Sequence, residues 1–195
     1  MRNKALLLIV PSLVLAVSTI TLGSNMGFKI SIPLKADVPN YVSLPYCTSY
    51  TDARLLFADI PNCQQVARMV PGTGRIEHWP GPRARNFRIR PGEAYVVRVR
   101  RNCIWVVVGS HDPRVQIVLK AGGPNLVSIP YNTRALTANA LLAEIPSATR
   151  IAAYDPKSGQ WRECSQVQPA SFALEAGDGL LVYVQHDSLW VPSHF

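Results

Sequence analysis

Arginines form the densest group of side chains with binding chemistry in this chain. Seven fall between residues 83 and 101, and six of them make up the candidate contact surface: Arg85, Arg88, Arg90, Arg98, Arg100 and Arg101. We expect the segments 86–90 and 94–100 to pair as a hairpin around a Pro-Gly-Glu turn. The arginines at 88, 90, 98 and 100 would then line one face of two neighbouring strands, because alternate residues of a strand share a face.

Guanidinium groups bind carboxylate, sulfate and phosphate through paired hydrogen bonds, and a patch of one charge sign attracts a polyanion. The arginine surface therefore predicts contact with an anionic surface polymer, a lipid head group or an acidic protein. The alternative is a solvated sheet face whose charges keep the edge from pairing with other sheets.

Two tryptophans offer a different chemistry. Trp79 and Trp161 follow turns, and an exposed Trp beside a turn can stack on a sugar ring. They support a second hypothesis, a carbohydrate-binding protein, although either side chain could instead close the rim of the core. Trp105 and Trp190 lie in Val- and Ile-rich strands, where we expect core packing.

Catalytic and metal-binding patterns are missing from the sequence. The four histidines make no His-Glu-x-x-His motif, and there is no nucleophile elbow, P-loop or dinucleotide fingerprint. We predict a non-enzymatic protein without cofactor or metal, and keep an unrecognised hydrolase as a third hypothesis.

The first 23 residues read as a signal peptide. Arg2 and Lys4 precede the apolar run 5–17, and small residues follow it. We predict a bacterial protein that is secreted, periplasmic or on the cell surface, with no membrane span after cleavage. A retained N-terminal anchor is the alternative, but the run is short for a span.

Four cysteines remain after cleavage. An even number in an oxidising compartment favours disulfides, with three pairings that the sequence leaves open, whereas the spacing fits a zinc site poorly. The candidates are Cys47, Cys63, Cys103 and Cys164.

The chain repeats itself with an offset of 85 residues. The segment 39–46, PNYVSLPY, matches 124–131, PNLVSIPY, and the segments that follow match in turn. We predict two modules, residues 28–112 and 113–195. The first carries 12 Lys and Arg against 6 Asp and Glu, and the second 6 against 6, so the surplus of positive charge after the signal peptide lies in module 1.

Periodicity sets the expected structure of each copy. Alternating runs such as 30–34 and 115–119 indicate strands, and residues 53–60 and 138–145 have helical spacing, each ending at a Pro. The prediction is a mainly β protein with one short helix per repeat, as two tandem sandwich- or barrel-like modules of about 85 residues.

The motif Asn-x-Val-Ser-[Leu/Ile]-Pro, followed by Phe-x-[Ile/Leu]-x-x-Gly-[Glu/Asp], resembles a β-rich module of exported bacterial surface proteins that are largely uncharacterised. The resemblance covers nearly all of the chain after the leader and implies no catalytic residue. The second copy has Leu180 where the first has Tyr95. We therefore expect an exported binding or structural protein that contacts an anionic polymer or acidic protein, has no specific nucleic-acid partner and can self-associate.

Overall fold

The computed structural model describes residues 27–193, so the predicted signal peptide lies outside the described residues. The fold is mainly β, with two short helices. Module 1 contains β1 (Gly27–Leu34), β2 (Asn40–Ser43), α1 (Ala53–Asp59), β3 (Cys63–Met69), β4 (Ile76–Trp79), β5 (Ala94–Val99) and β6 (Cys103–Ser110). Module 2 contains β7 (Ile117–Leu119), β8 (Asn125–Ser128), α2 (Ala138–Glu144), β9 (Ala148–Asp155), β10 (Gln160–Ser165), β11 (Gly179–Val184) and β12 (Ser188–Trp190).

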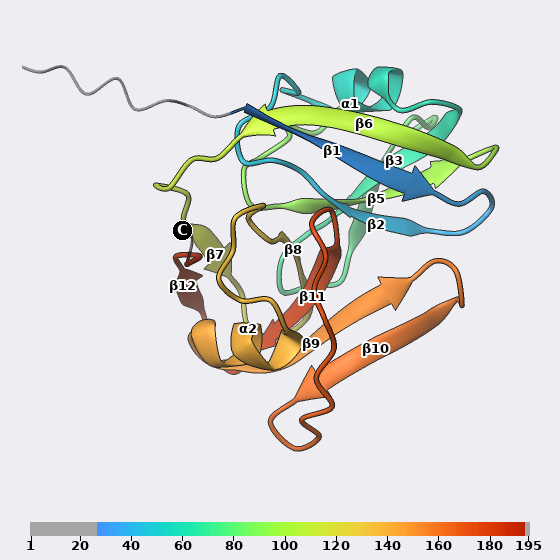
Figure 1. Ribbon diagram of the computed structural model, residues 1–195. Coiled ribbons are helices and arrows are strands. Elements are labelled where there is room, and N and C mark those ends of the chain that lie inside the picture. The colour runs from blue at the N-terminus through green and yellow to red at the C-terminus, as the bar shows by residue number, and fades with distance from the viewer. Residues whose placement is uncertain (1–26, 194–195) are drawn as a thin grey trace, which may run out of the picture.

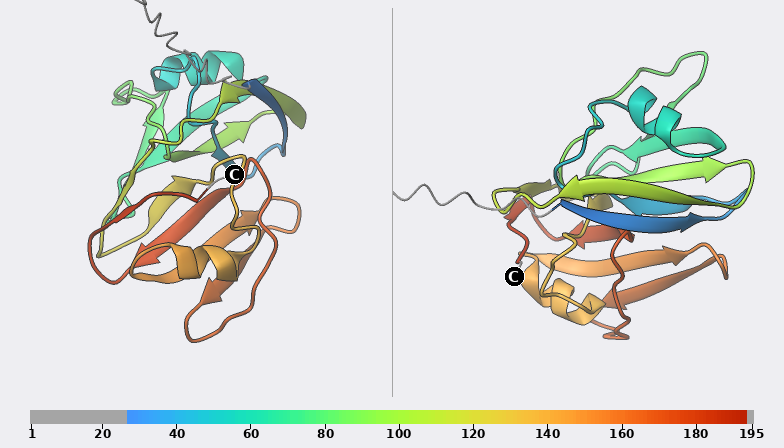
Figure 2. Two further views of the ribbon diagram at one scale, coloured as in Figure 1. Left: turned by 60° about the vertical axis from the view of Figure 1, so that its left-hand side comes forward. Right: turned by 45° about the horizontal axis from the view of Figure 1, so that its top comes forward.

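Each module is sandwich-like and combines a two-stranded ribbon with a four-stranded sheet. In module 1 the ribbon is β1-β6 and the sheet order is β2-β5-β3-β4; in module 2 they are β12-β7 and β10-β9-β11-β8. Alternation along the strands puts apolar residues between ribbon and sheet, as in β1, where Ile30, Ile32 and Leu34 are buried. Module 1 lies above module 2 in Figure 1 and in both views of Figure 2.

The two helices begin and end as their sequences predict. Asp52 caps α1 by accepting from the Leu55 N–H, and Thr137 caps α2 by accepting from the Ala140 N–H. Pro61 and Pro146 stand shortly after the helix ends, where they prevent continuation.

A buried tryptophan anchors each helix to its ribbon. The indole N–H of Trp105 donates to Asp59 at 2.8 Å, and that of Trp190 donates to Glu144 at 2.9 Å. Both tryptophans are 1% exposed, which confirms the prediction that they pack in the cores.

The four-stranded sheets of the two modules pack against each other. Ala94, Leu126, Ala152 and Leu181 form a separate buried cluster at this contact. Two equivalent hydrogen bonds cross it: the Ser43 N–H donates to Gly177 O at 2.7 Å, and the Ser128 N–H donates to Gly92 O at 2.9 Å. The turn before β5 therefore adds a backbone hydrogen bond to β8 of module 2, and the turn before β11 adds one to β2 of module 1.

The hairpin predicted between 86–90 and 94–100 is wrong. Strand β5 pairs with β2 and β3, while the segment 87–89 bonds to 51–53 instead. The cause lies at Gly92, which has a φ of 82° and packs against Ile117 of module 2. The turn is thus directed into the other module, which separates the two halves of the expected hairpin.

The predicted disulfides are also absent, since all four cysteines are free thiols. Cys164 is buried in the core of module 2, whereas the other three belong to module 1. The thiols of Cys63 and Cys103 donate to the carbonyls of Gln65 and Pro61. Burial raises the pKa of Cys63 to about 12, so this thiol stays protonated at neutral pH.

Candidate functional site

A cleft of about 750 Å³ lies between the modules. Its module 1 wall is made by β1 and the start of β2, and its module 2 wall by the turn after β9 and the segment 175–178. A cavity of this volume is within the range of small-molecule sites, which lie preferentially where domains meet.

Three aromatic side chains from both modules meet at the cleft. Tyr41 and Tyr154 line it with ring centroids 5.5 Å apart. Trp161 packs on both, at 5.1 Å from Tyr41 and 5.2 Å from Tyr154, and remains 39% exposed. Burial raises the pKa of Tyr41, so its hydroxyl keeps its proton and can donate a hydrogen bond.

The charged lining residues are of both signs and are not mutually neutralised by close ion pairs. They are Lys35, Lys157, Arg162, Asp155, Glu175 and Asp178. Among residues 27–193 no ion pair within 4.0 Å joins any two of these. Asp155 has a structural role, because the Lys157 N–H and the Ser158 hydroxyl donate to it and hold its pKa below the usual range.

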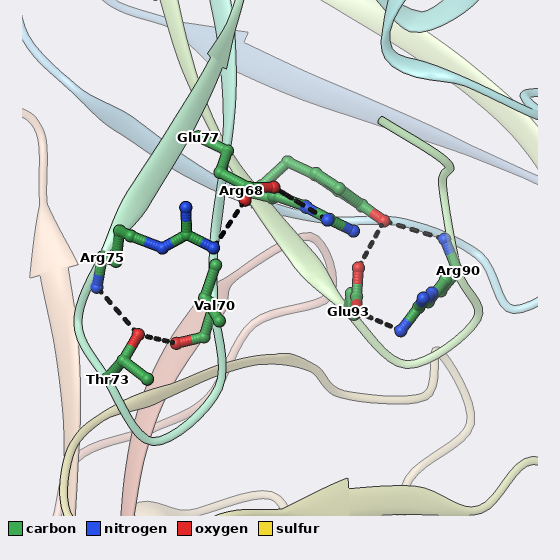
Figure 3. A network of polar contacts seen from close by, with 8 residues as sticks. Arg68, Val70, Thr73, Arg75, Glu77, Arg90 and Glu93 are labelled. Carbon is green, nitrogen blue, oxygen red and sulfur yellow. Dashed lines mark hydrogen bonds and ion pairs between the residues drawn. The ribbon is translucent and has the colours of Figure 1, made fainter. Parts of the chain in front are cut away.

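Asp178 differs from its counterpart in module 1, which is Glu93. Glu93 accepts from the Tyr95 hydroxyl at 3.2 Å and lies 3.8 Å from the Arg90 guanidinium. Figure 3 shows the contact between Glu93 and Arg90. In module 2 the equivalents of Tyr95 and Arg90 are Leu180 and Glu175. Among residues 27–193 the Asp178 carboxylate accepts a hydrogen bond only from the Glu175 N–H, and burial raises its pKa.

Because the chain is duplicated, the turn after β3 faces module 2 in the same way as the turn after β9 faces module 1. The turn after β3 is in backbone contact with module 2, which we call the closed side, whereas the turn after β9 borders the cleft, which we call the open side. On the closed side the Gly72 N–H donates to Pro124 O at 3.1 Å. A Cβ at Gly72 would lie 2.6 Å from the Lys120 Cβ, and a Cβ at Gly123 would lie 2.6 Å from Gly72 O. This backbone contact therefore requires glycine at both positions.

On the open side, Lys157 and Val38 occupy the positions equivalent to Gly72 and Gly123. Their side chains prevent the same close approach of the two turns. The contact across that side is made by a side chain in place of the backbone, with the Lys35 Nζ donating to Lys157 O at 3.1 Å. Two substitutions between the copies thus account for the open cleft.

The six predicted arginines do not gather on one hairpin face. Arg88 and Arg90 line a second, smaller pocket, whereas Arg98 projects from β5 opposite Gln65 of β3. The remaining three, Arg85, Arg100 and Arg101, are exposed in loop or turn segments. Within residues 27–193, Arg90 is the only one of the six that forms an ion pair.

The two predicted tryptophans have different surroundings. Trp161 belongs to the aromatic group at the cleft, but Trp79 on β4 is partly buried against the core of module 1. Trp79 is therefore not part of the cleft.

Sequence inspection missed Tyr41 and Tyr154, although a signal for them existed. Comparing the copies position by position gives Leu126 opposite Tyr41, Met69 opposite Tyr154 and Ile76 opposite Trp161. Each of these three aromatic residues has a non-aromatic residue at the equivalent position of the other copy, and all three aromatic residues lie on the open side.

Among the described residues no group of three or more His, Cys, Asp or Glu is placed to hold a metal ion. Neither α1 nor α2, the helices of residues 27–193, has the length and apolar character that crossing a bilayer needs. Comparison with protein-family models, with curated proteins and with solved structures gives no match for this chain.

Proposed function

We propose that this chain is an exported binding protein without enzymatic activity, and that its intermodule cleft receives a carbohydrate. The observation that carries the proposal is the aromatic wall of Tyr41 and Tyr154, with Trp161 against both, in a cleft open on only one of two equivalent sides. Aromatic faces stack on the C–H faces of sugar rings, and charged and amide groups around them bind hydroxyls.

The lining also favours a polyhydroxyl ligand over a strongly charged one. Three positive and three negative side chains line the cleft, so its net charge is near zero. Hydroxyl groups both donate and accept hydrogen bonds, and they can satisfy Asp178 as well as Arg162.

Binding is favoured over hydrolysis by the state of the carboxylates. A glycosidase needs two carboxyl groups that are free to act on the scissile bond. Of the three lining carboxylates, Asp155 accepts two hydrogen bonds within its own turn and Asp178 accepts one from the Glu175 N–H, so among residues 27–193 only Glu175 has a carboxylate without such a bond.

The test is a screen of the full chain against neutral oligosaccharides at high salt, followed by calorimetric titration of any ligand found. We expect Tyr41→Ala to weaken binding between about threefold and tenfold, since an aromatic contact contributes on the order of 1 kcal/mol. Trp161→Ala should also weaken binding, because Trp161 packs against both tyrosines that line the cleft. High salt removes attraction that depends only on net charge.

Ile76→Ala is the matched control, because Ile76 occupies the position of Trp161 on the closed side and is 46% exposed. It should leave affinity unchanged. Equal losses in the control and in Trp161→Ala, or no neutral glycan bound at all, would contradict the proposal.

A further inference from the structure

A second pocket, of about 370 Å³, lies in module 1 between the segments 44–51 and 88–91. Leu44, Pro45 and Ile89 give it apolar walls, and threonine residues also line it. Within the part of the chain that the structure describes, Arg88 and Arg90 are the only charged residues that line the pocket, so its lining carries two positive charges.

Module 2 shows that these arginines are not needed to build the pocket's frame. In module 1 the Ala53 N–H donates to Phe87 O at 2.9 Å, and the Ile89 N–H donates to Thr51 O at 3.0 Å. In module 2 the same two bonds are made by Ala138 and Leu174, at 2.9 and 3.1 Å.

The bridge between Asp52 and Arg88 also has its counterpart, between Thr137 and Ala173. The residues equivalent to Arg88 and Arg90 are thus Ala173 and Glu175, on the same backbone. Since the same backbone hydrogen bonds form in module 2 without arginine, the two arginines are not needed for folding of this segment, and we look for a binding role.

Nearby carboxylates offset only one of the two charges. Arg88 has no ion pair among residues 27–193, and Arg90 lies 3.8 Å from Glu93, which also accepts from the Tyr95 hydroxyl. Asp52 is occupied as the cap of α1, and Asp59 accepts from the Tyr50 hydroxyl and the Trp105 indole. Arg88 thus leaves the pocket with a positive charge that has no carboxylate partner among residues 27–193, and a bound anion would supply the negative charge.

We propose that this pocket is a binding site for a compact oxyanion, a sulfate, phosphate-ester or carboxylate group of a larger ligand, held by Arg88 and Arg90. Guanidinium groups match the geometry of such anions, and Thr48 and Thr51 line the same space. The site is independent of the carbohydrate cleft and does not need it to be occupied.

The experiment uses the full chain and two probes, inorganic sulfate and inorganic phosphate. Each is titrated at constant ionic strength, with sodium chloride as the balancing salt, while amide NMR shifts are followed. We expect saturable shifts at residues 44–51 and 88–91. Arg88→Gln with Arg90→Gln should weaken binding at least tenfold.

The control is Arg100→Gln with Arg101→Gln, which removes the same charge from exposed positions outside the pocket. It should leave the shifts at 44–51 unchanged. The absence of saturable binding by either probe, or an equal loss in the control, would overturn the proposal.

A second arm identifies the source of the anion. Retention of the wild type on a sulfated oligosaccharide is compared with retention on phosphatidylglycerol vesicles. The ligand whose retention is lost in the Arg88 and Arg90 variant carries the group that the pocket binds. Introducing Arg at positions 173 and 175 should create a second site, because the frame is already there.

Discussion

At the scale of single residues, the two copies differ where a polar group has lost its partners. Glu93 and Asp178 occupy equivalent positions, yet only Glu93 has a tyrosine hydroxyl and an arginine beside it. The Asp178 carboxylate is left partly buried at the cleft with one main-chain donor. A ligand group that donates hydrogen bonds would meet an acceptor there.

The pH dependence of stability should report this difference. Burial raises the pKa of Asp178 above its ordinary value of 3.8, so its contribution to stability is present below that value and is lost as pH rises through the folded-state pKa. We therefore expect Asp178→Asn to be more stable than wild type at neutral pH and equally stable in strong acid. Thermal unfolding measured by circular dichroism over a pH series checks this.

Asp187→Asn is the control with the opposite sign. Lys120 and the Ala121 N–H lower the pKa of Asp187, so its contribution is present at neutral pH and is lost as pH falls. If the Asp178 variant follows the wild-type curve at every pH, the carboxylate is not destabilised by burial.

At the scale of elements, the turn after β3 and the turn after β9 determine where the two modules are in close contact and where a cleft remains. Gly72 and Gly159 have the same φ of 72°, but their surroundings differ. A Cβ at Gly159 would meet only the Tyr154 hydroxyl at 3.8 Å, whereas one at Gly72 would overlap the backbone of module 2.

This pair gives a matched test. Gly159→Ala should cost about 1 kcal/mol, for the left-handed backbone alone. Gly72→Ala should cost a further 1–3 kcal/mol or so, because the turn must move away from the Lys120 segment. Chemical denaturation measures both, and equal costs would mean that the closed side does not depend on the contact.

The same scale shows what the sequence predicts and what it leaves undetermined. Alternation correctly placed the arginines at 88, 90, 98 and 100 at the surface, and the residues between them, Phe87, Ile89, Val97 and Val99, are buried. It assigned the wrong partner to β5, because a period of two fixes the face of a strand but not its neighbour. The partner is set by the Gly92 turn, whose contacts lie in the other module.

Sequence motifs did not predict the cleft, because the residues that line it come from both modules. Its aromatic lining combines Tyr41 of β2 with Tyr154 of β9, and these two come together only when the modules pack, whereas Trp161 of β10 is already the cross-strand partner of Tyr154 within module 2. The cysteine prediction failed differently, because pairing requires proximity and the even count carried no information about distance.

At the scale of the whole molecule, the two modules depend on each other. Tyr46 of module 1 is buried in the core of module 2, where its hydroxyl donates to Ser128 O at 3.2 Å. The buried cluster of Ala94, Leu126, Ala152 and Leu181 combines residues from both modules.

We therefore expect the full chain to unfold in one cooperative transition by calorimetry. Residues 27–112 expressed alone should melt at a lower temperature and less cooperatively, because the intermodule face becomes exposed. Two separate transitions in the full chain, or a fragment that melts like the full chain, would contradict this.

The exchange of loops between modules has a consequence for the order in which the chain folds. Strand β2 is completed by the backbone of Gly177, which is synthesised far later than β2 itself. At roughly 5–20 residues per second, that partner follows after several seconds or more. Throughout this interval the edge strand β2 lacks a native hydrogen-bond partner, so we expect the nascent chain to be prone to association through this edge until residue 177 has been synthesised.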